Sequence, residues 1–379
     1  MRISGLKGGL ATSIGPRLAS LFRRPVPVDF RPRRILVLKP CCLGDVLMST
    51  AAVRALSESF SEAEIDYAVG PWSRPALGNN RRLTELIDTG VVGAGSFPPL
   101  AYFRLCRDVR RRRYDLCVIL ERAALMALLP WFAGIPVRVG LDSGGRGFAL
   151  TAGVPVEGVR HEVDRYLDVV SAARASVVDP RLEFSPTTEE SEAARTILET
   201  LGWCGRPFVV LNAGGGVNPG MRLDAKRWPP DRFGVLAKLL LDAGLDVVLT
   251  GGDTDRAAVA EVRKHANGVI DLAGRVSFGE LAGVFQLADL FVGNDTGAMH
   301  LAVAVGTPVV AVFGPTDPRV YGPYRTGEVV TMDVPCRPCF ERGTYRVCDH
   351  ISCTRRLDVE LVWAGVQTQL GRSSRRSTT

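Results

Sequence analysis

The chain has 379 residues, which is too long for one ordinary core and suits two domains. Apolar residues make up 46% and charged residues 23% of the sequence, so the composition excludes a disordered chain and indicates a well-packed globular protein. The formal net charge is +7, and basic residues are concentrated in residues 1–34 and 107–113. These patches suit phosphate-bearing partners, including an anionic membrane surface. The alternative is that they are solvated faces of surface helices.

No segment is predicted to cross a membrane. The longest apolar run, residues 123–137, has about 15 residues and contains two prolines, whereas a spanning helix needs about 20. Glycines interrupt any secretory apolar segment in residues 1–34. We therefore expect a cytoplasmic protein, either free or peripheral on the inner face of the cytoplasmic membrane. Nucleic acid is not an expected partner, because the sequence has no aromatic stacking motif or readout helix.

Strands and helices alternate through the first half of the chain. Apolar runs at residues 35–38, 65–69, 116–120 and 137–139 are typical of buried strands, and residues 46–60 and 123–133 have helical spacing. This alternation predicts a parallel, doubly wound sheet. Residues 177–190 are polar and contain prolines, as expected of a linker. We therefore expect a basic N-terminal extension at 1–32 and a first domain at 33–180.

The same alternation restarts after the linker. Strands are predicted at 208–211, 247–249, 269–270, 290–292 and 309–313, with helices at 230–243, 255–264, 281–288 and 297–305. Ser277 and Glu280 have capping-box spacing ahead of the third of these helices. The sequence therefore predicts a second domain at 190–370 and a disordered tail at 371–379. The expected fold is α/β, with two doubly wound domains that face a cleft.

The first motif lies between a predicted strand and helix, at residues 39–45. Gly44 permits a tight turn, and Asp45 falls at the predicted N-cap of the following helix. Aspartate is a preferred N-cap residue, worth about 1 kcal/mol, so a purely structural role is one interpretation. The other is that the Asp45 carboxylate faces the cleft and acts as a general base.

The second motif follows the predicted strand at 208–211. Gly214 and Gly215 belong to a run of three glycines whose backbone N–H groups could approach a phosphate closely. Lys226 and Arg227 precede a helix N-terminus, where positive charge is unfavourable unless an anion is shared. The sequence thus indicates an anion site, and the alternative is a flexible surface loop.

The third motif occupies residues 293–300. A predicted strand ends at Asp295, and the amides of Thr296 and Gly297 open the next helix, which would make a diphosphate cradle. His300 lies one turn further along and faces the same end of the helix. The alternative is an ordinary N-cap followed by a packed histidine.

Together these segments resemble glycosyltransferase family 9, whose best-known members are the ADP-heptose:lipopolysaccharide heptosyltransferases. The resemblance runs through residues 33–56, 225–240, 247–255 and 272–318. It implies the GT-B architecture, with two Rossmann-like domains that bind the acceptor and the nucleotide sugar respectively. It also implies an inverting transfer of a heptose or related sugar from an ADP-sugar to a lipopolysaccharide core or similar phosphorylated glycan. No metal or other cofactor is expected in catalysis.

The resemblance also implies roles for individual residues. Asp45 is expected to deprotonate the acceptor hydroxyl, and Lys226 to neutralise the leaving diphosphate. Asp295 is expected near the sugar, His300 beside the diphosphate, and either Asp253 or Asp255 on the ribose. The full donor-binding set is Gly214, Gly215, Lys226, Asp253, Asp255, Asp295, Thr296, Gly297 and His300.

Cysteines depart from the family's pattern in one place and cluster in another. Cys41 and Cys42 stand where the family commonly has two serines, which weakens any hydrogen bond to a phosphate or acceptor there. Four further cysteines have short spacings: Cys336, Cys339, Cys348 and Cys353. They suit a structural zinc site, unmetallated thiols or disulfides, and we expect no catalytic role for them.

Two other functions remain open at this point. A nucleotide-sugar epimerase could use the same architecture, but it would need further acid and base residues around the sugar. A non-catalytic nucleotide-sugar or glycan-binding protein would keep the donor cradle and would not need Asp45.

Overall fold

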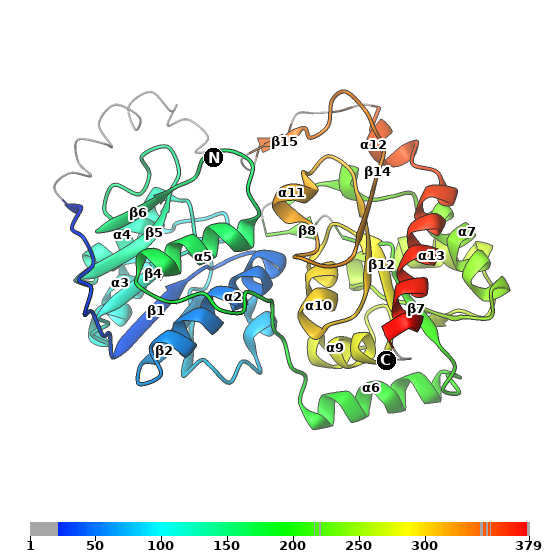
Figure 1. Ribbon diagram of the computed structural model, residues 1–379, viewed down its shortest axis with the longest axis horizontal. Coiled ribbons are helices and arrows are strands. Elements are labelled where there is room, and N and C mark those ends of the chain that lie inside the picture. Colours follow the sequence, from blue (N-terminus) through cyan, green and yellow to red (C-terminus); the bar gives the residue numbers. More distant parts are fainter. Residues whose placement is uncertain are drawn as a thin grey trace. The chain divides into compact units, whose positions relative to one another are not determined.

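The computed structural model describes residues 22–215, 217–219, 221–341, 344–345, 348 and 350–376. The chain forms two compact units that meet in sequence between Arg181 and Leu182. Each unit is built on one six-stranded sheet (Figure 1). Most of the predicted basic extension, residues 1–21, and the last three residues of the predicted tail lie outside the described residues.

The first unit contains a sheet in which every neighbouring pair of strands is parallel. Its strand order is β3-β2-β1-β4-β5-β6. The strands are β1 (Arg34–Leu38), β2 (Glu64–Val69), β3 (Glu85–Asp88), β4 (Leu116–Ile119), β5 (Val137–Asp142) and β6 (Ala152–Pro155), and the helices are α2 (Leu43–Ser59), η1 (Arg74–Leu77), α3 (Pro99–Arg111), α4 (Ala124–Phe132) and α5 (Glu162–Ala172). Helix α2 packs against α5, and α3 packs against α4. Leu36 and Leu38 of β1 share one core cluster with Leu105 of α3 and Leu129 of α4.

The second unit also contains a parallel six-stranded sheet, in the order β11-β10-β7-β12-β13-β14. Its strands are β7 (Phe208–Asn212), β10 (Asp246–Leu249), β11 (Ile270–Asp271), β12 (Leu290–Asn294), β13 (Val309–Phe313) and β14 (Glu328–Thr331). Its helices are α6 (Thr188–Thr200), η2 (Asp224–Lys226), α7 (Pro230–Asp242), η3 (Asp253–Asp255), α8 (Arg256–His265), α9 (Phe278–Leu287), α10 (Gly297–Val305), α11 (Pro318–Tyr321), α12 (Ser352–Arg355) and α13 (Val359–Arg376). Two short antiparallel pairs complete it: β8 (Val217–Asn218) with β9 (Met221–Arg222), and β15 (Phe340–Glu341) with β16 (Thr344–Tyr345).

Both sheets have the same topology. When the strands of each six-stranded sheet are numbered in chain order, both orders read 3-2-1-4-5-6. The direction of winding therefore reverses beside the first strand, between β1 and β4 in the first unit and between β7 and β12 in the second. In doubly wound sheets, ligands bind outside the carboxyl ends of the strands at this reversal. The predicted α/β class with two doubly wound domains is confirmed.

Several local predictions need correction. Helix α13 continues through residues 371–376, which the composition assigned to a disordered tail, and α6 begins inside the predicted linker. Part of the predicted extension packs on the first unit, because Arg23 pairs with Asp142 at 2.6 Å and the Arg24 amide donates to the Thr151 carbonyl.

Ser277 and Glu280 form the predicted capping box at the start of α9. Among the described helices, none has the length and apolarity needed to cross a membrane.

Candidate functional site

Asn294, the last residue of β12, joins the segments that meet at the reversal point of the second sheet. Its side chain is fully buried. Its Oδ1 accepts a hydrogen bond from the Trp228 amide at 2.9 Å, and its Nδ2 donates to the carbonyls of Ala213 and Gly214 at 3.3 and 3.0 Å. Asn294 therefore holds two segments against the end of β12. One is the loop after β7 that contains Gly214 and Gly215, here called the glycine loop, and the other is the segment after Lys226. The sequence pattern does not predict this role, although Asn294 lies within the third motif.

Lys226 and Asp295, both predicted as donor-binding residues, form an ion pair. The distance from Lys226 Nζ to Asp295 Oδ2 is 2.6 Å, and the two side chains are 16% and 5% exposed. The same Asp295 oxygen accepts a hydrogen bond from Thr316 Oγ1 at 2.7 Å. The Lys226 ammonium also lies 5.8 Å from the centre of the Phe340 ring. A partly exposed ammonium is thus held at the carboxyl edge of the sheet, where an incoming anion could share it.

The buried carboxylate of Asp255 connects the glycine loop with the loop after β10. Its carboxylate accepts hydrogen bonds from the amides of Gly215 and Gly252 at 3.2 and 3.0 Å, and it pairs with Arg227 at 3.3 Å. A Cβ on Gly214 would fall 2.1 Å from the Asp255 carboxyl carbon, so this close approach requires glycine. Asp255 therefore has protein partners for both carboxylate oxygens.

Asp253 differs from Asp255 in its surroundings. Its side chain is 82% exposed and pairs with Arg256 at 2.8 Å, three residues further along the chain. The structure therefore brings Asp255, but not Asp253, into contact with the glycine loop.

The N-terminus of α10 lies directly against the glycine loop. Thr296 is the N-cap residue, but its side chain makes no capping hydrogen bond, and its Oγ1 is shielded from solvent without a hydrogen-bond partner among the described residues. Gly215 has a φ of +110°, and a Cβ there would come within 2.0 Å of the Thr296 methyl carbon. The first amides of a helix have no intrahelical acceptor, so Gly297 and its neighbours can bind an anion. His300 is buried in the second turn of the same helix.

At the reversal point of the first sheet, Asp45 occupies a different helical position from the one expected. The N-cap of α2 is Cys42, and Asp45 is the third residue of the helix. The prediction of an N-cap aspartate is therefore wrong. The helix starts earlier because the Val46 amide already donates to the Cys42 carbonyl at 2.8 Å, which places Gly44 inside the first turn. The Asp45 side chain remains 26% exposed.

Lys39 connects Asp45 with a carboxylate that the sequence pattern does not single out. Lys39 Nζ lies 3.4 Å from Asp45 Oδ2 and 2.9 Å from Glu121 Oε2. Burial opposes charge on Lys39, but the carboxylates of Asp45 and Glu121 outweigh it and hold the pKa of Lys39 well above its usual value. Lys39 is therefore an ammonium between two carboxylates. Glu121 could have been suspected from the sequence, because it follows the buried run of β4 almost directly.

A second charged pair lies beside this network. Arg122 donates to Glu162 Oε1 at 2.7 Å, and Glu162 is buried at the start of α5. Tyr166, one turn further along α5, is fully buried, and its hydroxyl has no hydrogen-bond partner among the described residues. Burial raises the pKa of Tyr166 well above its ordinary value, so this hydroxyl keeps its proton. The edge of the first sheet thus gathers ionised and neutral groups that could bind and deprotonate a polar acceptor.

Cys41 and Cys42 lie next to this network, and their sulfurs are 2.6 Å apart. The hydrogen bond between the two thiols lowers the pKa of Cys41 from its usual value.

The four C-terminal cysteines are not joined in disulfides in the structure. Within the described part of the chain, no group of three or more histidine, cysteine and acidic side chains is placed to hold a metal. Burial and the neighbouring thiols of Cys339, Cys336 and Cys348 raise the pKa of Cys353 to about 11. Their segment supports the site, because the amide of Cys339 donates to the Pro315 carbonyl, next to Thr316.

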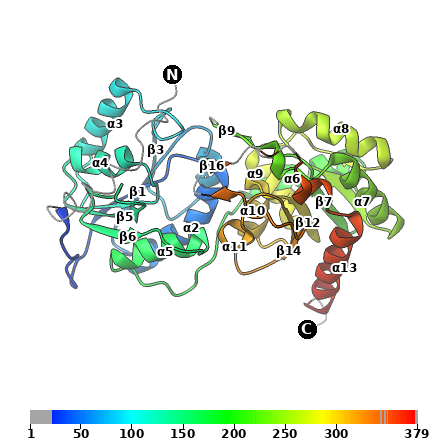
Figure 2. The same cartoon turned by 90° about the horizontal axis from the view of Figure 1, so that it is seen from above.

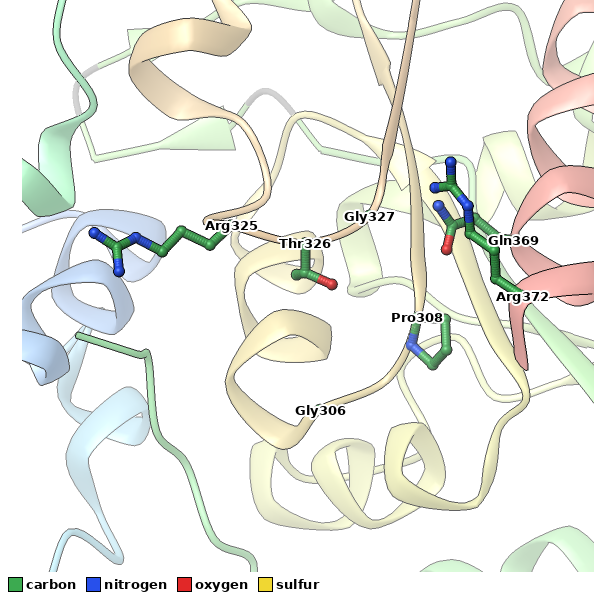
Figure 3. A pocket seen from close by; sticks show the side chains of 7 residues that line it. All are labelled: Gly306, Pro308, Arg325, Thr326, Gly327, Gln369 and Arg372. Carbon is green, nitrogen blue, oxygen red and sulfur yellow. The ribbon is translucent and has the colours of Figure 1, made fainter. Parts of the chain in front are cut away.

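A pocket of about 460 Å³ lies elsewhere in the second unit (Figure 3). It is lined by Gly306, Pro308, Arg325, Thr326, Gly327, Gln369 and Arg372. Pro308 and Gly327 immediately precede β13 and β14, so this pocket lies at the amino ends of strands, whereas the predicted donor residues follow their carboxyl ends. No predicted site residue lines it, and it is not the candidate site.

Replacing Asn294 with alanine is expected to destabilise the protein by about 2–4 kcal/mol, because three buried backbone groups lose their partner. Denaturant unfolding followed by circular dichroism would measure the loss. Asn267→Ala is a suitable control, since Asn267 is exposed on the surface of the same unit and should change stability by less than about 0.5 kcal/mol. Equal stability of the two variants would contradict the role assigned to Asn294.

Sequence comparison identifies relatives that match most of the chain. A family model described as glycosyltransferase family 9 (heptosyltransferase) matches residues 102–348, a range that includes every predicted donor residue but not Asp45. Lipopolysaccharide heptosyltransferase 2 of Escherichia coli strain K12 is 30% identical over 298 residues, which cover 75% of this chain and 84% of that protein. These matches favour a glycosyltransferase over an epimerase or a non-catalytic binding protein.

Solved structures share the fold. The structure of E. coli ADP-heptose lps heptosyltransferase II has a TM-score of 0.70 at 24% identity and covers 90% of this chain and 99% of its own. E. coli heptosyltransferase WaaC with ADP-2-deoxy-2-fluoro heptose has a TM-score of 0.67 at 19% identity and covers 88% and 99%. The two parallel six-stranded sheets thus correspond to the GT-B architecture.

Proposed function

Because the chain belongs to glycosyltransferase family 9, we propose that it transfers a heptose or related sugar from an ADP-sugar to a phosphorylated glycan such as a lipopolysaccharide core. The observation that carries this proposal is the Lys226–Asp295 ion pair at the edge of the second sheet, in the unit whose glycine loop meets the N-terminus of α10. This arrangement suits a diphosphate attached to a sugar. The relatives' names support the choice of donor and acceptor, since they include a lipopolysaccharide heptosyltransferase and a complex with an ADP-heptose analogue.

The donor's diphosphate would bind the first amides of α10 and the ammonium of Lys226. Thr296 Oγ1 is a hydroxyl without a protein partner in the described structure, so it can donate to a phosphate oxygen. Asp295 stays anchored by Thr316 when Lys226 turns toward the phosphates, which leaves a carboxylate for the sugar hydroxyls. Positive groups fixed where charge develops on the leaving group stabilise the transition state. In this proposal the protein supplies the positive groups, and no metal is required.

The acceptor hydroxyl would lose its proton to Asp45. Lys39 lies on Oδ2 of Asp45 and orients the carboxylate, so the other oxygen is available for the acceptor. Inversion at a sugar carbon by direct displacement needs one base opposite the leaving group, so a single carboxylate is sufficient. The proposal requires the two units to bring acceptor and donor together during the reaction.

We further propose that residues 33–180 form the acceptor domain and residues 190–370 the donor domain. The ribose of the donor would lie near Asp253 or Asp255, and the diphosphate near His300. The basic residues 107–113 suit attachment to the inner face of the cytoplasmic membrane, because anionic lipids attract clustered arginines.

ADP-sugars are expected to stabilise the protein more than UDP-, GDP- or dTDP-sugars. A ligand at 100 times its dissociation constant stabilises the folded state by about 2.7 kcal/mol, which is readily measured by thermal shift. Lys226→Ala should reduce the shift caused by the ADP-sugar. A larger shift with a UDP- or GDP-sugar would overturn the assignment of the donor and leave the family membership intact.

A further inference from the structure

A cluster of apolar side chains is exposed on the first unit. Its members are Leu100 (75% exposed) and Phe103 (58%) on α3, with Leu125 (40%), Trp131 (42%) and Phe132 (41%) on α4. The two helices are neighbours in both views of the molecule (Figures 1 and 2). They are joined by a hydrogen bond of 2.7 Å from the Tyr102 hydroxyl to the Leu125 carbonyl. We call these five side chains the α3–α4 patch.

The aromatic members of the α3–α4 patch contact one another, and Phe103 and Phe132 also contact Tyr102 at the margin of the core. Trp131 contacts Phe22 as well. The ring centres of Phe103 and Phe132 are 6.2 Å apart, and those of Trp131 and Phe132 are 4.9 Å apart. The core is filled without them, because α3 buries Leu105 and Val109 on its opposite face. A cluster of apolar side chains that stays exposed in the folded protein indicates a surface that binds another protein or a membrane.

The exposed face of α3 continues from these apolar residues into basic ones. Residues 99–113 contain six arginines and one acidic residue, Asp108. Arg104, Arg107, Arg110 and Arg111 are all exposed. The Arg110 guanidinium donates to the Phe132 carbonyl at 3.5 Å, so the basic surface and the α3–α4 patch are contiguous. A surface with aromatic rings beside arginines suits an anionic bilayer for two reasons. The headgroup region accommodates amphipathic rings, and the lipid phosphates attract cations.

One end of the α3–α4 patch adjoins the acceptor side of the proposed site. Helix α4 begins three residues after Glu121, whose carboxylate pairs with Lys39 beside Asp45, and Leu125 is its second residue. Trp131 and Phe132 lie at the opposite end of the helix.

We propose that the α3–α4 patch docks the protein on an anionic lipid bilayer. Phe103, Trp131 and Phe132 lie at headgroup depth, and the exposed arginines of α3 bind lipid phosphates. This inference rests on the membrane attachment proposed above and assigns that attachment to one surface of the protein. Its test uses vesicles that contain no glycan acceptor, so failure removes the docking surface and leaves the sugar transfer untouched.

The experiment is flotation of the full-length chain with vesicles of phosphatidylglycerol and phosphatidylethanolamine, compared with phosphatidylcholine vesicles. The wild type should float with the anionic vesicles only. The double variant F103S/W131S should lower the partition coefficient by at least about tenfold at every salt concentration. The triple variant R107Q/R110Q/R111Q should lower it by about a hundredfold at low salt and much less at high salt, because salt screens the arginines.

Matched controls lie on the second unit. L361S removes an apolar side chain that is 50% exposed on α13, and K238Q/R263Q/K264Q removes three exposed charges from α7 and α8. Both should float like the wild type, and all variants should keep its melting temperature. Unchanged flotation of F103S/W131S would overturn the proposal. So would a concentration-dependent dimer that this variant abolishes, since the α3–α4 patch would then bind a second copy of the chain.

Discussion

Asp45→Asn is expected to lower turnover by about 10²–10⁴-fold, which is the range for loss of a general base. Asparagine keeps the size of the side chain but cannot take the proton of the acceptor hydroxyl. Lys39 retains its partner Glu121 at 2.9 Å in this variant, so the buried ammonium is not left without a carboxylate. Stability and donor affinity should therefore stay close to those of the wild type. Steady-state kinetics with saturating donor, together with donor titration, would measure both quantities.

The competing explanation is that Asp45 only stabilises the first turn of α2. A carboxylate there interacts favourably with the helix dipole by about 0.3–1 kcal/mol, and asparagine would lose that term. Glu62→Gln is the control, because Glu62 is exposed on the same unit and belongs to no proposed site. If Asp45→Asn turned over as fast as Glu62→Gln and differed only in melting temperature, Asp45 would be a helix-terminus charge and not a base.

Lys226→Ala should impair both donor binding and chemistry. Loss of one fixed positive group at the leaving diphosphate is expected to slow turnover by about 10²–10³-fold. Donor affinity should fall by at least about tenfold, since a charge-assisted contact to phosphate is removed. The variant should also lose about 2–4 kcal/mol of stability, because Asp295 is 5% exposed and loses its cationic partner.

A second substitution separates these effects. Lys226→Ala combined with Asp295→Asn removes the unpaired charge, so stability should return toward that of the wild type while turnover stays low. Arg222→Ala is the matched control, because Arg222 lies in the same segment, is 66% exposed and pairs only with Asp224 among the described ion pairs. Donor affinity that is equal in Lys226→Ala and Arg222→Ala would refute the role of Lys226 at the diphosphate.

The strands that flank the proposed sites could be predicted from the sequence because parallel sheets are covered on both faces. Strands β7, β12 and β13 are buried at every position, which makes them continuous apolar runs. The edge strands β3 and β6 were not predicted, since each carries exposed or half-exposed residues and has no such run. The order of the strands in each sheet could not be predicted either, because periodicity along the chain does not indicate which strands are neighbours.

The same limit applies to the proposed site residues. Lys226 and Asp295 could each be selected from a motif, but their ion pair depends on β7 lying beside β12. The sequence pattern does not indicate Glu121, because its partner Lys39 is 82 residues away and becomes its neighbour only through the pairing of β1 with β4. The sequence predicts Asp45 at the N-cap because aspartate is favourable both there and at the third helical position, so residue type alone cannot separate the two.

The central claim is that this chain joins a sugar from an ADP-sugar to a separate acceptor. Mass spectrometry of a phosphorylated lipopolysaccharide-core acceptor, incubated with ADP-heptose and the full-length protein, tests it most directly. The account predicts that the acceptor gains the mass of one heptosyl unit, that one ADP is released for each unit transferred, and that Asp45→Asn nearly abolishes both. ADP-heptose that is bound, isomerised or hydrolysed while the acceptor mass stays unchanged would contradict it.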